Sequence, residues 1–342
     1  MWLYFALKIG DFQEMQTAER AELLPLLADL DEQRFETVAN AVFRYQATHN
    51  PLYAKFLKLL NRQPSTVNRI PFLPIQFFKT QAIKTGDWEP KTVFTSSSTT
   101  GQTPSRHLVR DVDFYLKNAR RGFAQFYGEP SEWCVLALLP SYLEREGSSL
   151  VAMADYFIRT SRHPESGFFL HDFEKLRDAL IFCKSKGYKT ILLGVSFALL
   201  DFAEQYPMDL SGITVMETGG MKGRRRELTR PELHQTLRTA FNLEEVHSEY
   251  GMTELFSQAY AQGGSLFAPA PTMRVLTTEI NDPFCPAAPG RTGMLNIIDL
   301  ANLDTCSFIQ TEDVGRVYAD GRFEVLGRLD VAEMRGCNLM VE

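Results

Sequence analysis

Cysteine is scarce in this chain and follows no ligand pattern. Five of the 342 residues are cysteines, namely Cys134, Cys183, Cys285, Cys306 and Cys337. Their number is odd and their spacing fits no zinc motif. Disulfide frameworks belong mainly to small secreted domains, and this chain is far longer than those. We therefore expect neither a disulfide framework nor a structural metal site.

Long hydrophobic runs are also missing. The apolar start, Met1–Leu7, is too short to cross a bilayer and has no basic residues before it. Lys and Arg number 36 against 42 Asp and Glu, so the net charge is −6 and general nucleic-acid binding is disfavoured. We expect a cytoplasmic protein that neither spans a membrane nor binds nucleic acid. Met15 is an alternative start, and the sequence leaves the oligomeric state open.

The Gly-Lys-Ser/Thr signature of P-loop proteins is absent as well. The chain instead carries six consecutive hydroxyl residues, Thr95–Thr100, followed by Gly101. Apolar and β-branched residues flank this stretch at Thr92–Phe94 and His107–Val109, which predicts strand, polar loop, strand. Hydroxyls and successive backbone N–H groups at a glycine turn suit a phosphate. A flexible linker is the alternative, because runs rich in Ser and Thr are commonly loops.

Strand and helix patterns alternate through the middle of the chain. The apolar run Trp133–Leu139 predicts a buried strand, and further strands are expected at Lys189–Val195, Ile213–Glu217 and Val246–Ser248. Helix-capping residues stand between them: Ser148 or Ser149, Asp172, and Thr229 with Glu232 in a capping box. This alternation predicts an α/β fold with a parallel or mixed sheet.

The two ends of the chain have different patterns. Apolar residues at helical spacing predict helices over Asp31–Thr48 and Pro51–Leu60, so the first sixty residues form a helical layer. After Phe267 the pattern predicts a β-rich region with Asp320–Gly321 as a hairpin turn. Its expected strands are Met273–Ile280, Gly293–Asp299, Ser307–Gln310, Gly315–Tyr318 and Phe323–Leu326.

Three motifs resemble, in the expected order, those of the adenylate-forming enzymes: acyl-CoA synthetases, adenylation domains and luciferases. Ser97–Gly101 resembles the phosphate-binding signature, with Ser98 where that family usually has Gly. Glu249–Glu254, which reads Glu-Tyr-Gly-Met-Thr-Glu, resembles the adenylate-contacting motif. Thr311–Gly315, followed by Gly327–Asp330, resembles the ribose motif and the hinge.

The flanking sequence resembles one branch of this superfamily more closely. Ile70–Lys79, Leu139–Arg145 and Glu217–Gly223 are similar to the acyl-protein synthetases, the fatty acid-activating components of bioluminescence-type fatty acid reductases, which are related to phenylacetate-CoA ligases. The resemblance runs from near Asn50 to the end. It implies a large adenylate-forming N-terminal domain with mixed sheets and a β-rich subdomain, without the C-terminal lid domain. We expect a helical layer over 1–70, an α/β adenylate-binding core over 71–265, and a β-rich subdomain with a hinge-like tail over 266–342.

The resemblance also implies ATP and Mg²⁺ as ligands. Glu254 would bind Mg²⁺, which prefers hard oxygen ligands, and Thr253 would contact the α-phosphate. The other residues that it assigns to the nucleotide are Ser96, Ser97, Ser98, Thr99, Thr100, Gly101 and Thr103 for the triphosphate, Gly219, Gly220, Met221, Tyr250 and Gly251 for the adenine, and Asp313 and Arg328 for the ribose. The alternatives are a turn with a solvated carboxylate, a plain glycine loop and a surface ion pair.

Cys337 is the candidate acyl carrier. Its place matches the cysteine near the C-terminus that bears the acyl group in acyl-protein synthetases, and Arg335 favours its thiolate. The alternative is a small buried hydrophobic residue. The implied function is activation of a carboxylic acid, a fatty acid, to acyl-AMP, capture on Cys337 and transfer to an acyl-CoA-reductase-like partner. A compact acyl- or aryl-CoA ligase and a nucleotide-binding module without catalysis are the two rivals.

Overall fold

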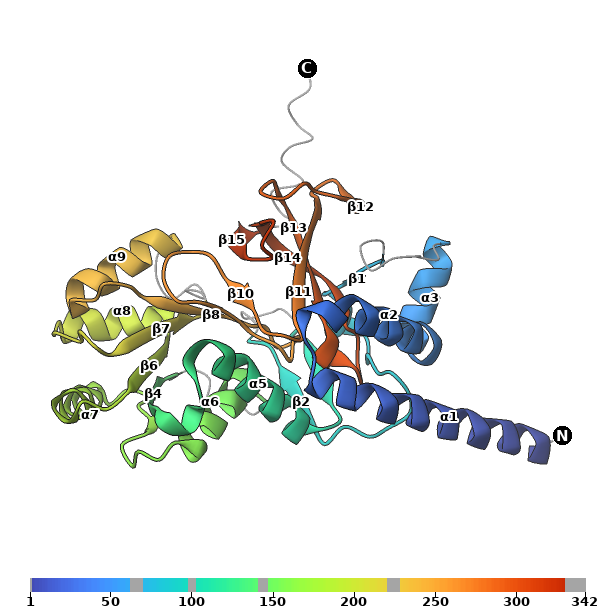
Figure 1. Ribbon diagram of the computed structural model, residues 1–342, viewed down its shortest axis with the longest axis horizontal. Coiled ribbons are helices and arrows are strands. Elements are labelled where there is room, and N and C mark those ends of the chain that lie inside the picture. The colour runs from blue at the N-terminus through green and yellow to red at the C-terminus, as the bar shows by residue number, and fades with distance from the viewer. Residues whose placement is uncertain (1, 62–69, 98–102, 141–146, 220–227, 330–342) are drawn as a thin grey trace, which may run out of the picture. The chain divides into compact units, whose positions relative to one another are not determined.

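The computed structural model describes residues 2–61, 70–97, 103–140, 147–219 and 228–329 of the chain (Figure 1). Its internal contacts divide the chain into two compact units. Unit 1 is discontinuous and comprises Met1–Glu89 and Pro271–Glu342, and unit 2 comprises Pro90–Ala270. The three-part division expected from the sequence stays a prediction. Within the described residues, no helix is both long and apolar enough to cross a membrane.

Unit 2 is built on a mixed sheet. Parallel pairing joins β5, β4, β6, β7 and β8, and antiparallel pairing adds β9 and β10. In sheet order, its strands within the described residues are β10 (Ala268–Pro269), β9 (Ala259–Ala261), β8 (His247–Tyr250), β7 (Thr214–Thr218), β6 (Thr190–Val195), β4 (Cys134–Leu138) and β5 (Gly167–Phe168). The central strands β4 and β6 are buried along their whole length, as their unbroken apolar sequence predicts.

Three helices of unit 2, α6 (Ser149–Thr160), α7 (Phe173–Lys186) and α9 (Arg230–Phe241), begin at the caps that the sequence predicts. Ser148 accepts a hydrogen bond from the Val151 N–H, and Thr229 and Glu232 form the predicted capping box. Asp172 caps α7, and the other helices in the described part of unit 2 are α5 (Val112–Tyr127) and α8 (Ser196–Gln205), with a 3-10 turn, η2, at Pro130–Glu132. The α/β alternation of the sequence analysis is confirmed.

A separate hairpin carries the hydroxyl stretch. β2 (Thr92–Thr95) and β3 (Arg106–Val109) pair antiparallel, with Thr95 opposite Arg106. Both strands stand where the flanking apolar runs predicted them, so the two expected strands are confirmed, whereas residues 98–102 between them lie outside the described residues.

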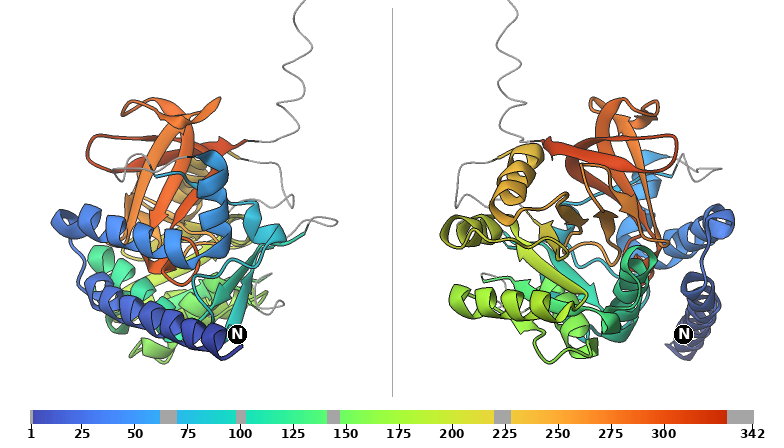
Figure 2. Two further views of the ribbon diagram at one scale, coloured as in Figure 1. Left: turned by 90° about the vertical axis from the view of Figure 1, so that its right-hand side faces the viewer. Right: turned by 60° about the vertical axis from the view of Figure 1, so that its left-hand side comes forward.

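The sheet of unit 1, whose later strands are orange to red in Figure 2, is mixed too, since β1 pairs parallel to β14 and the other pairs are antiparallel. Its strands in the described part of the chain are β1 (Leu73–Pro74), β14 (Phe308–Val317), β13 (Thr292–Asp299), β11 (Met273–Glu279) and β12 (Asp282–Pro286), with β15 (Phe323–Arg328) also on β14. Two strands expected separately, Ser307–Gln310 and Gly315–Tyr318, are one strand, β14. The predicted turn at Asp320–Gly321 does join β14 to β15, and Gly321 has φ 80°.

Helices from the start of the chain belong to the same unit. They are α1 (Trp2–Ala28), α2 (Glu32–His49), α3 (Pro51–Leu60) and the short α4 (Phe77–Thr80), with a 3-10 turn, η3, at Leu300–Asn302. Arg20 forms an ion pair with Asp304 at 2.6 Å. Buried Gln46 donates to the carbonyl oxygen of Asn302 at 3.0 Å and accepts from the Ser307 N–H at 2.9 Å. The helical layer and the β-rich region therefore form one core.

Candidate functional site

Two loops of the predicted site leave the sheet of unit 2 at the same edge. β7 ends at Thr218, followed by Gly219, and the parallel neighbour β8 ends at Tyr250, followed by Gly251. Loops at the carboxyl ends of parallel strands are the usual binding place in α/β sheets. The loop predicted to bind adenine and the motif predicted to contact the adenylate thus start side by side.

A buried hydrogen bond joins these two strand ends on one face of the sheet. The Thr218 hydroxyl donates to a carboxylate oxygen of Glu249. Burial raises the pKa of Glu249 to about 7, and the charge of Glu217 adds to this rise while the Thr218 hydroxyl opposes it. A Cβ at Gly251 would stand only 2.5 Å from the Glu249 carboxylate. A side chain at this position would therefore require the Glu249 carboxylate to move.

The opposite face carries a second buried carboxylate, Glu217. Strand alternation turns it away from Thr218 and toward α9. Arg230 Nε lies 3.1 Å from its Oε1, and His234 Nε2 lies 3.7 Å from the same oxygen. Burial would raise the pKa of Glu217, yet His234, the charge of Arg230 and Ser248 together lower it. Glu217 is thus an anionic anchor under the strand ends.

Ser196 at the start of α8 extends this anchor to the adenine loop. Its hydroxyl lies 2.8 Å from the Gly219 carbonyl oxygen and 3.1 Å from Glu217 Oε2. A hydroxyl has one proton to donate, so it serves one of these acceptors at a time. Gly219 has φ 71°, a left-handed value that glycine adopts freely. The Ser196 hydroxyl therefore helps to fix Gly219, the first residue of the predicted adenine loop.

Two hydrogen bonds between Ser96 and Ser105 close the base of the hydroxyl loop. The Ser105 N–H donates to the Ser96 hydroxyl at 2.8 Å, and the Ser96 N–H donates to the Ser105 carbonyl at 3.1 Å. Ser97 and Thr103 are exposed on either side of the loop. Ser98, Thr99, Thr100 and Gly101 lie outside the described residues. Among the described residues of the loop, Ser96 and Ser105 are the two that form hydrogen bonds with each other across its base.

The turn that carries Thr253 and Glu254 is fixed at several points. Its Leu255 N–H donates to the Met252 carbonyl at 3.1 Å. Buried His107 of β3 places Nδ1 2.9 Å from the Thr253 carbonyl oxygen. Asn118 of α5 donates to the Phe256 carbonyl at 3.0 Å. Glu254 is 7% exposed, so its carboxylate is held largely within the protein.

The carboxylate of Glu254 is a chemically suitable ligand for Mg²⁺. Mg²⁺ is commonly held by one or two carboxylates together with substrate phosphates. The described residues contain no group of three His, Cys, Asp or Glu side chains that could hold a metal on its own. A single carboxylate such as that of Glu254 fits an ion that brings most of its ligands with it as substrate phosphates and water.

The two predicted ribose residues pair with each other in unit 1. Asp313 of β14 lies opposite Arg328 of β15, and Arg328 Nε is 3.1 Å from Asp313 Oδ1. The Asp313 side chain is 7% exposed, whereas that of Arg328 is 65% exposed. An Arg beside a carboxylate orients its oxygens, so this pair presents a fixed acceptor on the strand.

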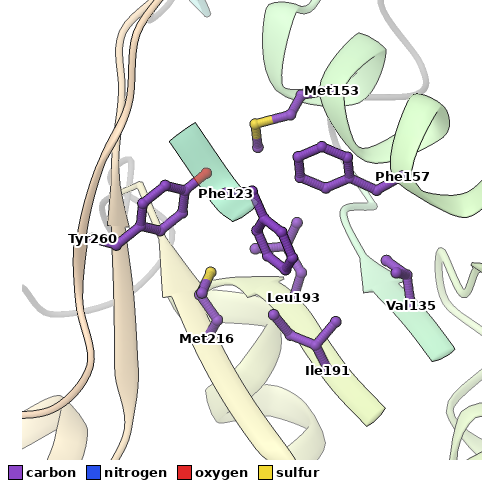
Figure 3. Close-up of a pocket in the computed structure, with 8 residues that line it drawn as sticks. All are labelled: Phe123, Val135, Met153, Phe157, Ile191, Leu193, Met216 and Tyr260. Carbon is purple, nitrogen blue, oxygen red and sulfur yellow. The ribbon is translucent and has the colours of Figure 1, made fainter. Parts of the chain in front are cut away.

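An apolar pocket lies on the Thr218 face of the unit 2 sheet (Figure 3). Its lining comes from α5, α6, β4, β6, β7 and β9, namely Phe123, Met153, Phe157, Val135, Ile191, Leu193, Met216 and Tyr260. Alternation puts Met216 and Thr218 on one face, and Tyr260 pairs with Glu249 across β8 and β9. The buried Tyr260 hydroxyl has no hydrogen-bond partner among the described residues. The pocket therefore shares its face of the sheet with the Thr218–Glu249 contact.

The structure places part of the predicted site together. Within unit 2 the closed base of the hydroxyl loop, Gly219, and the segment Tyr250–Glu254 are arranged around β3, β7 and β8. Gly220, Met221 and Cys337 lie outside the described residues. Tyr250 is 8% exposed and its ring packs on Phe267 at 5.7 Å.

Two residues of this region had no assigned role in the sequence. Glu249 opens a recognised motif, and a signal for it existed in its position directly after a predicted strand. His107 is packed inside the protein, and it also bonds the motif turn. Its partner Thr253 lies 146 residues away, so no local pattern could reveal the contact.

No family model matches the chain, and no curated protein matches its sequence. Solved structures do match. ATP-bound MatB from Rhodopseudomonas palustris aligns with a TM-score of 0.52 and 16% identity over 69% of this chain and 47% of MatB. 2-Hydroxyisobutyryl-CoA ligase in complex with 2-HIB-AMP aligns with a TM-score of 0.61 and 13% identity over 87% of this chain and 70% of the ligase. The same ligase in complex with 2-HIB-AMP and CoA aligns with a TM-score of 0.61 and 15% identity over 90% of this chain and 71% of the ligase.

These similarities show a shared fold. The predicted fold class, the α/β fold of the large domain of adenylate-forming ligases, is confirmed. The chain spans about half the length of MatB. One structural neighbour is titled as ATP-bound and another as a complex with an acyl-AMP, so ligands of this kind occupy the same fold elsewhere.

Proposed function

We propose that this chain activates a carboxylic acid with ATP to give acyl-AMP and pyrophosphate. One observation carries the proposal. The two strand-end loops at Gly219 and Tyr250–Glu254 adjoin a hydroxyl-rich hairpin, in a fold that binds ATP and an acyl-AMP in its structural neighbours. A carboxylate oxygen of the acid attacks the α-phosphorus, the bond to the β-phosphate breaks, and pyrophosphate leaves. Catalysis of such a step consists mainly of positioning and charge stabilisation.

The roles of the binding residues follow the motif resemblance. The hydroxyls and N–H groups of Ser96–Thr103 donate to the triphosphate, and Thr253 contacts the α-phosphate. Glu254 holds Mg²⁺, which neutralises phosphate charge when bound. Gly219, Gly220, Met221, Tyr250 and Gly251 accommodate the adenine, and Asp313 with Arg328 binds the ribose. The buried anchors Glu217 and Ser196 keep the Gly219 carbonyl in place.

We propose that the apolar part of the acid enters at the pocket of Figure 3, which has a volume of only about 10 Å³, room for about one water molecule, so its lining must open to admit a hydrocarbon. Its lining is apolar apart from one hydroxyl, and it lies on the sheet face that also carries Thr218 and Glu249. Each buried methylene is worth about 0.8 kcal/mol, so such a lining favours an acid with a hydrocarbon tail or ring. A fatty acid meets this description, and so does an aryl acid.

The acyl acceptor has two candidates. The sequence resemblance favours capture on Cys337 as a thioester and transfer to an acyl-CoA-reductase-like partner. The structural neighbours are CoA ligases, one of them solved with 2-HIB-AMP and CoA, which favours CoA as acceptor. In either case the sulfur attacks the acyl carbon and AMP leaves with the bonding electron pair.

Acid-dependent ATP–pyrophosphate exchange tests the first step. We expect exchange with at least one acid from a panel of saturated acids from hexanoate to palmitate together with phenylacetate. Exchange must require Mg²⁺ and the acid. A folded protein that binds Mg·ATP but exchanges no label with any acid is a nucleotide-binding module, and the proposal is then wrong.

A further inference from the structure

The hairpin that bears the hydroxyl loop contains one buried histidine. His107 lies in β3, two residues after Ser105, whose N–H is bound by the Ser96 hydroxyl at the loop base. Its side chain has no solvent exposure. It stands opposite Phe94 of β2 in the ladder, so both strands of the hairpin fix its backbone.

The same ring holds the turn of the adenylate-contacting motif. Nδ1 of His107 lies 2.9 Å from the Thr253 carbonyl oxygen. A carbonyl only accepts, so Nδ1 carries the proton and donates it. The ring also stacks on Phe256, with the centroids 4.6 Å apart and the planes at 29°. Phe256 packs further on Phe94 and Tyr115.

The charge state of the ring suits this role. Burial lowers the pKa of His107 to about 4, so the imidazole is neutral at neutral pH. A neutral ring with Nδ1 protonated adds no charge beside the phosphates and keeps a fixed donor direction. Asn118 of α5 holds the next part of the turn through the Phe256 carbonyl at 3.0 Å and the Ser257 hydroxyl at 3.2 Å.

We infer that His107 is a positioning residue that sets the Thr253–Glu254 turn at a fixed place relative to the hydroxyl hairpin. The inference rests on the proposed function, in which the two segments act on one triphosphate. Phosphate donors and the magnesium carboxylate stand on different parts of the chain, and a misplacement of about 1 Å can cost 100-fold in rate. The contact between His107 and Thr253 joins these two parts directly.

The test compares a variant that keeps the donor with one that loses it. In His107→Asn the side-chain N–H stands close to the original Nδ1, whereas His107→Leu has no donor. Phe241→Leu is the matched control, because Phe241 is fully buried in unit 2 at the end of α9, where its ring packs on Phe202 of α8. Three quantities are measured: the Mg²⁺ concentration for half-maximal pyrophosphate exchange, the Mg·ATP affinity by calorimetry, and the imidazole ¹⁵N NMR signals of His107.

The expected results separate positioning from stability. His107→Leu raises the half-maximal Mg²⁺ concentration about tenfold and weakens Mg·ATP binding, while His107→Asn stays within about twofold of the unmodified protein. Phe241→Leu melts at a lower temperature but keeps the normal Mg²⁺ requirement. NMR shows Nδ1 protonated and Nε2 not. If His107→Leu does not fold, His107→Gln, whose N–H lies further from the backbone, takes its place.

Two results overturn the inference: a donor-free variant with normal Mg²⁺ requirement and normal Mg·ATP affinity, or an Asn variant as defective as the Leu variant. The proposed function fails separately, if the unmodified protein binds Mg·ATP yet exchanges no pyrophosphate. The calorimetric comparison then still decides the role of His107. A protein that does not bind Mg·ATP at all overturns both.

Discussion

Glu254 is the single side chain on which the proposed adenylation depends most. Glu254→Gln keeps the shape of this nearly buried side chain and removes the charge that holds Mg²⁺. We expect acid-dependent pyrophosphate exchange to fall about 100-fold, the scale seen when one electrostatic stabiliser is removed. Glu244→Gln, on an exposed residue, is the control and should exchange normally. Normal exchange by a folded Glu254→Gln protein removes Glu254 from the site.

Two other buried groups make stability depend on pH in opposite directions. The pKa of His107 in the folded chain is about 4, below its ordinary 6.5, so stability is lost as pH falls from 6.5 toward 4. The pKa of Glu249 is about 7, above its ordinary 4.5, so stability is lost as pH rises from 4.5 through 7. Each contributes about 3 kcal/mol, and between pH 4.5 and 6.5 the two effects cancel.

Single substitutions should reveal how each of the two groups by itself makes the free energy of unfolding depend on pH. In Glu249→Gln, the free energy of unfolding should rise with pH between 4.5 and 6.5 more steeply than in the unmodified protein, because the contribution of His107 is left alone. In His107→Asn it should fall with pH over the same range. Urea unfolding at several pH values measures both slopes. Three parallel curves would mean that neither group titrates in the way its burial indicates.

At this scale the sequence predicted the motif residues but not the groups that hold them. Thr253 and Glu254 stand in a recognisable order of residue types, which a single chain displays. The partners of Glu217 and Glu249 depend on strand register, and that of His107 on the meeting of two distant segments. The spacing of residues along the sequence encodes neither the strand register nor the meeting of distant segments.

Helices and strands were predicted well where they are long enough to show a repeating pattern of apolar and polar residues. The capped helices α6, α7 and α9 begin at their predicted caps. β5, β9 and β10 span two or three residues, which show no alternation, and β12 contains two prolines at the sheet edge. β14 was divided in two because the polar segment Thr311–Gly315 looks like a loop. The Thr311 hydroxyl donates to the Leu295 carbonyl at 2.7 Å, which satisfies it inside the sheet.

The pocket formed by α5, α6 and the sheet should set the acid preference. Met153→Ala enlarges the pocket, and we expect exchange to shift toward longer or bulkier acids. Because a buried methylene is worth about 0.8 kcal/mol, each added carbon that fits should change the relative kcat/KM about fourfold. Exchange rates across the acid panel measure the shift as a ratio, which does not depend on the folded fraction.

Met273→Ala is the control for this pocket. Met273 is 3% exposed and belongs to unit 1, so its truncation should cost a similar 2–5 kcal/mol of stability. It should leave the order of preferred acids unchanged. The same order of acids in all three proteins would exclude this pocket as the place of the hydrocarbon.

At the scale of the whole molecule, the sequence could not predict which parts share a core. The helical layer and the β-rich region were expected as separate parts, yet Gln46 bonds residues more than 250 positions away and Arg20 pairs with Asp304. These contacts join segments that are far apart in the sequence, and only the fold reveals that the two regions belong to one unit. The α/β core of unit 2 is continuous in sequence, which is why its alternation could be read directly.

The last prediction concerns the acceptor of the acyl group. If Cys337 is the carrier, Cys337→Ser keeps acid-dependent pyrophosphate exchange, because that half-reaction needs no thiol. The variant should lose the hydroxylamine-labile mass increase that intact protein gains with acid, ATP and Mg²⁺. Among the cysteines in the described part of the chain, Cys285 is exposed and the others are buried. Both proteins should therefore carry Cys285→Ser, so that a surface thiol cannot take the label.

Buried thiols do not confuse this measurement. Burial raises the pKa of Cys306 to about 12, which keeps it protonated and unreactive. Cys134 and Cys183 lie with their sulfurs 3.4 Å apart inside unit 2; their contact and burial raise the pKa of Cys134, the same contact lowers the pKa of Cys183, and burial shields both thiols from an acyl donor. An adduct on the Cys285→Ser protein that vanishes with Cys337→Ser therefore identifies Cys337. No adduct with any acid, together with turnover when CoA is added, assigns the chain to the compact CoA ligases instead.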